Sequence, residues 1–204
     1  MMQFPDMSPS TFPPAVLAEI QSACEAEPAV LNSERIEQRF GSFGISVLPS
    51  EAGLRRSSVY SVNGQERVCR TYAVVRFAAQ PDDGYHEEHA KILAGNSIGA
   101  IFRSHGWDIH KQTLYIGSLP LPDCHATITR LMHLNNACEL ALHVYQLLLV
   151  RREKVFEYAT IIEAHHPAYL SEDDLLELYA HDETAALSSE SVADLAALVL
   201  ESGQ

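Results

Sequence analysis

The stretch RRSSVYSVNGQERVCRTYAVVRF, residues 55–77, decides the fold of this chain. Its two halves, residues 56–62 and 68–77, are rich in Val, Ser, Tyr and Thr, and such a composition favours β-strands. Between them lies Asn63-Gly64, the strongest short-range signal for a tight turn between two antiparallel strands. The sequence therefore predicts a β-hairpin here.

A second hairpin is expected further along the chain, where residues 141–151 form a long apolar run and residues 155–164 alternate between apolar and polar. The charged residues Arg152, Glu153 and Lys154 form the turn between them. Two more strands are expected at residues 45–48 and 108–117. Apolar spacing and capping residues predict helices at residues 14–27, 33–39, 87–93, 97–105, 171–179 and 192–201.

Strands in hairpins with helices between them indicate an α+β fold, with a single antiparallel sheet and helical insertions packed on one side of it. We expect an N-terminal tail and helix at residues 1–30, the main domain at residues 31–180 and an acidic C-terminal helix at residues 181–204. Pro120-Leu121-Pro122 predicts a loop after the fourth strand, and the stretch from there to Asn136 has no clear pattern.

The composition of the 204 residues narrows the class of protein. A hydrophobic share of 47% with 20% charged residues is typical of a soluble globular domain. The formal net charge of -13 disfavours nucleic acids and anionic membranes as partners. The apolar runs are too short to span a bilayer, and the four cysteines show neither a C-x-x-C pair nor a secretory signal. We therefore expect a cytoplasmic protein with no membrane partner, while the oligomeric state stays open.

Two arginines, Arg56 and Arg70, lie on the two strands of the first predicted hairpin. A guanidinium group binds a carboxylate through two parallel hydrogen bonds, so two of them in one pocket would suit a small dianionic acid. The alternative is that both are surface arginines that pair with Glu66 or Glu157 across the sheet.

The ten histidines do not form a metal-binding pattern. A helical zinc site needs its second histidine four residues after the first, whereas His86 and His89 are only three residues apart. His165-His166-Pro167 reads as a turn at the end of a strand, although a histidine there could reach a ligand. We expect no metal and no cofactor.

Several short motifs have the order and spacing of a known family. The chain resembles the chorismate lyase family (4-hydroxybenzoate synthases) and the effector-binding domains of GntR-type regulators, over about residues 35–170. The motifs that carry the resemblance are Arg56, Asn63-Gly64, Arg70-Thr71, Gly95-Asn96-Ser97-Ile98-Gly99 and Ile116-Gly117.

The resemblance implies an antiparallel sheet whose insertions enclose a buried pocket for an aromatic acid. Arg56 and Arg70 match the two substrate arginines of the family, and the Ile98 backbone amide would share an anion with Arg56. The implied activity is elimination of pyruvate from chorismate, or action on a related small anionic acid. This reaction needs a carboxyl group that handles a proton beside the ring.

The position of that carboxyl group departs from the family pattern. Counted from Lys154, the place of the family glutamate falls on Thr160. Glu157 and Glu163 lie three residues to either side, so in a regular strand both face opposite to Thr160 unless a bulge changes the register. They are the candidate acid/base residues.

Two other functions stay open beside the enzyme. The chain could bind an aromatic acid without turning it over, as the effector-binding relatives do. It could also be a fold whose pocket has closed and that serves protein interaction.

Overall fold

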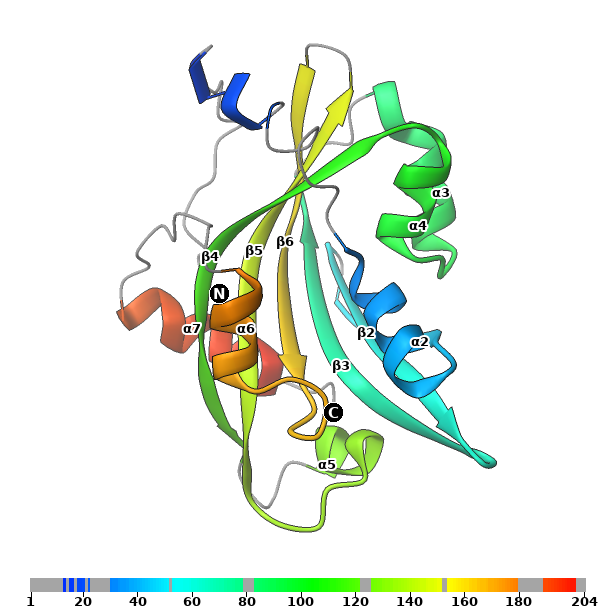
Figure 1. Ribbon diagram of the computed structural model, residues 1–204, viewed down its shortest axis with the longest axis vertical. Coiled ribbons are helices and arrows are strands. Elements are labelled where there is room, and N and C mark those ends of the chain that lie inside the picture. Colours follow the sequence, from blue (N-terminus) through cyan, green and yellow to red (C-terminus); the bar gives the residue numbers. More distant parts are fainter. Residues whose placement is uncertain are drawn as a thin grey trace.

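The computed structural model describes residues 13, 15–16, 18–20, 22, 30–51, 53–78, 83–121, 126–151, 154–179 and 189–200. Within them, six antiparallel strands form one open sheet in the order β1-β2-β3-β6-β5-β4 (Figure 1). The strands are β1 (Gly44–Leu48), β2 (Leu54–Asn63), β3 (Glu66–Phe77), β4 (Asp108–Leu121), β5 (Cys138–Arg151) and β6 (Lys154–His165). The predicted antiparallel α+β fold is confirmed.

The helices are α2 (Asn32–Phe40), α3 (His86–Leu93), α4 (Ile98–Ser104), α5 (Ala126–Met132), α6 (Glu172–Leu178) and α7 (Ser189–Leu200), with a short 3-10 helix η1 at Asp83–Tyr85. Of the first predicted helix, the described residues 15–16, 18–20 and 22 are helical. None of the described helices has the length and apolar character needed to cross a membrane.

Both predicted hairpins are present, and they join through the pairing of β3 with β6. Gly64 at the first turn has a φ of 64°, a left-handed conformation that glycine adopts without steric cost. The strands β3 and β6 therefore occupy the middle of the sheet, and β1 and β4 are its edges. Side chains from the two hairpins meet at this central seam.

Helices cover both faces of the sheet, which corrects the expectation of helices on one side only. We call the side that packs against α2, α3, α4 and α6 the pocket face, and the side that packs against α5 and α7 the far face. The reason lies in β5, whose apolar run from Ala141 to Val150 is buried on both sides. A strand of this kind needs cover on each face.

The helix α5 and the end of β4 lie where the sequence pattern was unclear. The loop was predicted to begin at Pro120, but in the structure β4 continues through Pro120 to Leu121. An edge strand tolerates proline, since one side of its backbone has no strand partner. The helix α5 then places Ile128 and Met132 in the far-face core.

Three β-bulges change which residues share a face. The registers leave Arg70 of β3, Leu114 of β4 and Tyr158 of β6 as extra residues without a direct cross-strand partner. An extra residue shifts the alternation of side chains by one position along the rest of the strand. The side-chain pattern of β6 therefore differs before and after Tyr158.

Candidate functional site

A pocket lies between the pocket face and the helices α2 and α4. Its empty volume is about 650 Å³, including space that is open to solvent. Much of its wall is apolar, with Val59, Ala73, Val75, Leu147 and Ile161 from four strands. Three charged side chains and an amide project among them from three strands and α2: Arg55, Lys111, Glu163 and Asn32. A mostly apolar pocket with a few charged groups is a common form of small-molecule site.

Two of the five predicted site residues line this pocket. Ile98 contributes at the start of α4, and Glu163 contributes from β6. Glu163 lies opposite Ala73 of β3 and His143 of β5, so its carboxylate comes from the middle of the sheet.

The structure does not bring Arg56 and Arg70 together. Arg56 is buried on the far face, where its guanidinium donates a hydrogen bond to the carbonyl of Leu198 in α7. Arg70 lies on the side of α2, with Nε donating to the Ser61 hydroxyl at 2.8 Å and the guanidinium 3.9 Å from the centre of the Phe40 ring. Neither lines the pocket, so the expected two-arginine pocket is corrected.

The alternation of side chains explains this correction. Arg55 and Arg56 are neighbours in β2 and so point to opposite faces, and it is Arg55 that enters the pocket. Arg70 is the extra residue of the bulge in β3. The sequence shows that two arginines are adjacent in this strand. Which of them enters the pocket depends on which helices cover each face of β2.

Glu157 and Glu163 lie on opposite faces, although the sequence predicts one shared face. Leu148 pairs with Glu157 and belongs to a far-face cluster with Val150, while the adjacent Leu147 lines the pocket. Glu157 therefore lies on the far face. It is half-buried, and its Oε2 has no hydrogen-bond partner within the described residues. The bulge at Tyr158 is the physical cause of the difference.

Two cations in the pocket, Arg55 and Lys111, have no carboxylate partner in the described part of the chain. Arg55 is 5% exposed, and its Nη2 donates to the carbonyl of Asn96 at 3.1 Å. Burial lowers the pKa of Arg55. Lys111 is 8% exposed, with Nζ 3.5 Å from the Tyr179 hydroxyl and 4.6 Å from the centre of the Tyr145 ring. Among the described residues, neither forms an ion pair with an acidic side chain.

A third cation, Arg35 of α2, lies close to the same site. Its side chain forms a hydrogen bond with Tyr179 and interacts electrostatically with Glu163. Three positive groups and one carboxylate thus lie in or beside the pocket of a protein whose formal net charge is -13. The local potential has the sign that attracts an anion, opposite to that of the whole chain.

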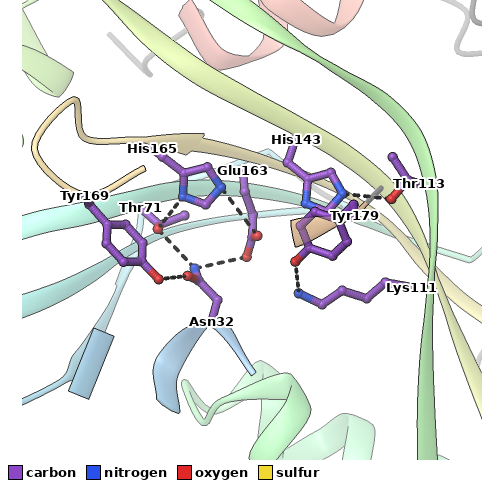
Figure 2. A network of polar contacts seen from close by, with 9 residues as sticks. All are labelled: Asn32, Thr71, Lys111, Thr113, His143, Glu163, His165, Tyr169 and Tyr179. Atoms are coloured by element: carbon purple, nitrogen blue, oxygen red, sulfur yellow. Dashed lines mark hydrogen bonds and ion pairs between the residues drawn. The ribbon is translucent and has the colours of Figure 1, made fainter. Parts of the chain in front are cut away.

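Glu163 is held in a buried polar network, shown in Figure 2. Its Oε1 accepts a hydrogen bond from Asn32 Nδ2 at 3.3 Å, and its Oε2 lies 3.9 Å from His165 Nε2. Burial lowers the pKa of His165 to about 4, although the charge of Glu163 acts in the opposite direction. His165 is therefore neutral at pH 7.

A second histidine, His143, lies fully buried beside this network. Its Nε2 is 3.1 Å from the Thr113 hydroxyl, and its ring lies 4.1 Å from the Tyr179 ring, centre to centre. Burial, followed by the charge of Lys111, holds the pKa of His143 well below its usual value. The pocket face thus contains two neutral histidines at physiological pH.

No group of three or more histidine, cysteine or acidic side chains suited to a metal ion occurs in the described part of the chain. His89 of the H-x-x-H pair instead places Nδ1 2.9 Å from the Tyr158 hydroxyl. Sequence reasoning missed Arg55, Lys111 and Asn32, and it treated His165 as part of a turn, with a ligand contact as the alternative. Their chemistry was visible, but no pattern indicated that they meet.

Comparisons of the chain with protein-family models, curated proteins and solved structures gave no match.

Proposed function

We propose that the pocket binds a small aromatic or pre-aromatic acid with two anionic groups, and that the protein is a chorismate lyase-like enzyme. The observation that carries this proposal is the pair of buried cations, Arg55 and Lys111, without a carboxylate partner among the described residues. Buried charges are strongly destabilising unless they are paired. A dianionic ligand would supply the missing partners.

The placement of the two cations supports a ligand with anionic groups at its two ends. Arg55 projects from β2 and Lys111 from β4, four strand positions apart in the sheet. This is roughly 19 Å between the strands at the usual strand spacing, so the two long side chains approach the pocket from opposite sides. The apolar wall between them suits a ring.

Glu163 supports a reaction rather than binding alone. In the elimination of pyruvate from chorismate, a ring C–H proton is removed and the bond from the adjacent ring carbon to the enolpyruvyl oxygen breaks. The ring becomes aromatic, and the enolpyruvate that leaves converts to pyruvate. A carboxylate beside the bound ring can accept that proton. Glu163 lines the pocket between the two cations and is the residue that we assign to this role.

The test is to incubate the purified chain with chorismate and follow 4-hydroxybenzoate and pyruvate by chromatography. Glu163→Gln should lower turnover by at least about a hundredfold while binding persists. Arg55→Met and Lys111→Met should each weaken binding by about tenfold or more, because each removes a charge-assisted contact. Arg56→Met is the matched control, since it removes an adjacent arginine from the other face and should leave the affinity unchanged.

Two results would count against the proposal. If chorismate and 4-hydroxybenzoate bind but no product forms, the protein is a ligand-binding protein with the same pocket. If neither binds, or if Arg56→Met weakens binding as much as Arg55→Met, the pocket is not a site for this class of acid.

A further inference from the structure

The buried network around Glu163 is a chain of hydrogen bonds whose direction can be worked out. It starts at Tyr169, which follows β6, and passes through Asn32 of α2 and Thr71 of β3 to His165 of β6 (Figure 2). Thr71 and His165 are at most 1% exposed, so solvent does not compete for these contacts. The direction of each bond then follows from which atoms can donate.

The first two bonds fix the orientation of the Asn32 amide. The Tyr169 hydroxyl donates to Asn32 Oδ1 at 2.7 Å, and an amide oxygen can only accept. The other side of the amide, Nδ2, therefore faces Thr71 Oγ1 at 3.0 Å and Glu163 Oε1 at 3.3 Å. The reverse orientation would place the amide oxygen against the carboxylate, which is repulsive.

The third bond, together with the carboxylate that faces Nε2, indicates the tautomer of His165. Because Thr71 Oγ1 accepts from Asn32, its own proton is available for His165 Nδ1, 3.0 Å away. A neutral imidazole that accepts at Nδ1 carries its proton on Nε2. This Nε2 is buried, has no hydrogen-bond partner among the described residues, and lies 3.9 Å from Glu163 Oε2.

The arrangement contains a hydroxyl, a histidine and a carboxylate, but its order excludes a nucleophilic triad. In such a triad the hydroxyl faces the substrate and the carboxylate lies behind the histidine. Here Thr71 is fully buried, and it is Glu163 that lines the pocket. The hydroxyl thus orients the histidine, and the histidine faces the carboxylate.

We propose that His165 is a positioning residue for Glu163, held in its Nε2–H tautomer by Thr71, Asn32 and Tyr169. Asn32 and His165 then present one N–H group to each carboxylate oxygen, and with the hydrogen bond from the Tyr145 hydroxyl they set the direction in which the carboxylate faces the pocket. The distance of 3.9 Å is longer than a hydrogen bond, and we expect it to shorten when a ligand fills the pocket. The catalytic consequence rests on the proposed function, whereas the tautomer does not.

The ligand-free test is nitrogen NMR of the full chain with 15N-labelled histidine at pH 7. We expect the His165 spectrum to show a protonated Nε2 and an unprotonated Nδ1. Thr71→Val removes the hydroxyl at nearly constant volume and should shift the tautomer, while Thr71→Ser should restore it. A protonated Nδ1 in the unmodified chain, or an unchanged tautomer in Thr71→Val, would overturn the proposal.

The catalytic test compares two amide replacements of His165. Gln places its NH2 near the position of Nε2 and so keeps a donor toward Glu163, whereas Asn reaches only the position of Nδ1. With chorismate as the probe, His165→Asn should lower kcat about tenfold or more with KM little changed, and His165→Gln should keep most of the activity. Equal losses in both variants would show a structural role only. If the unmodified chain does not turn over chorismate, the proposed function fails, and the NMR experiment still decides the positioning role.

Discussion

The two faces of the sheet bury different kinds of side chain from the same strands. On the far face, β5 presents Leu140, Leu142 and Val144, all at most 1% exposed, to a core shared with α5 and α7. On the pocket face, the same strand presents His143 and Tyr145 beside Lys111 and Glu163. Apolar burial stabilises a fold, whereas buried charge costs free energy unless it is paired. The far face is thus mainly apolar along β5, whereas the pocket face also carries the buried charged groups for which we propose a ligand.

The largest expected effect comes from Leu142→Ala on the far face, compared with Leu147→Ala on the pocket face of the same strand. Leu142 lies in a filled core, so the change leaves a new cavity and should lower the free energy of unfolding by about 2 to 5 kcal/mol. Leu147 already borders an empty pocket, so its loss should be clearly smaller. Urea unfolding followed by circular dichroism measures both, and equal losses would contradict the comparison.

The second effect concerns pH and arises from the buried histidines of the pocket face. The pKa of His165 falls from 6.5 to about 4 on folding, so between these values the unfolded chain binds more protons. Stability from this source is complete above about pH 6.5 and is lost as the pH falls toward 4, by about 3 kcal/mol. His143 acts in the same direction.

Urea unfolding at a series of pH values tests this effect, with His165→Gln as the control. The variant should lose much of the slope between pH 6.5 and 4. The same slope in both proteins would show that the acid sensitivity comes from other groups.

The third effect compares the neighbours Arg55 and Arg56, which point to opposite faces. Arg56→Met removes a buried charged donor to the Leu198 carbonyl, so it should cost about 2 kcal/mol of stability. Arg55→Met removes a buried charge that has no carboxylate partner among the described residues, and water can replace its bond to the carbonyl of the exposed Asn96, so the ligand-free protein should be as stable or more stable. Thermal unfolding of both variants is the measurement. The opposite ranking would mean that Arg55 serves the fold.

The smallest effect concerns α6, which covers the pocket face near β4. The Ser171 hydroxyl accepts a hydrogen bond from the Asp174 backbone N–H at 3.1 Å and so caps the start of this helix. Ser171→Ala should lower stability by about 1 kcal/mol. Because α6 leads directly to Tyr179, which contacts Lys111, the affinity for an acid should be measured in the same variant. A change larger than Lys111→Met itself would contradict the assignment of Lys111 as the binding group.

The parts of the fold that follow from local chemistry were predictable. Asn63-Gly64 identified the first hairpin, and the apolar run of β5 with the alternation of β6 identified the second. The helix α5 was missed, because the unpatterned stretch before it gave no start signal. Helices on one side were expected, although the long apolar run at residues 141–151 was itself a signal that both faces of β5 need cover.

The site was less predictable, because it depends on which face each side chain occupies. Glu163 and Ile98 were found, whereas Arg56 was chosen in place of its neighbour Arg55. Within a strand, one position is enough to move a side chain to the other face. The β-bulges decide which face each later residue of a strand occupies, and they arise from packing between strands. The sequence near Arg70 or Tyr158 contains no motif that predicts them.

The extra residue Tyr158 also affects how this chain should be aligned with others. A count along β6 that starts at the turn near Lys154 crosses the bulge, while a count back from His165 does not. Glu163 is therefore best located from the end of its strand. In a homologue without the bulge, a one-residue gap would fall at Tyr158, and the residues aligned with Glu157 and Glu163 would keep their opposite faces. A count made without that gap would be wrong by one position and would assign Glu157 to the face that Glu163 occupies.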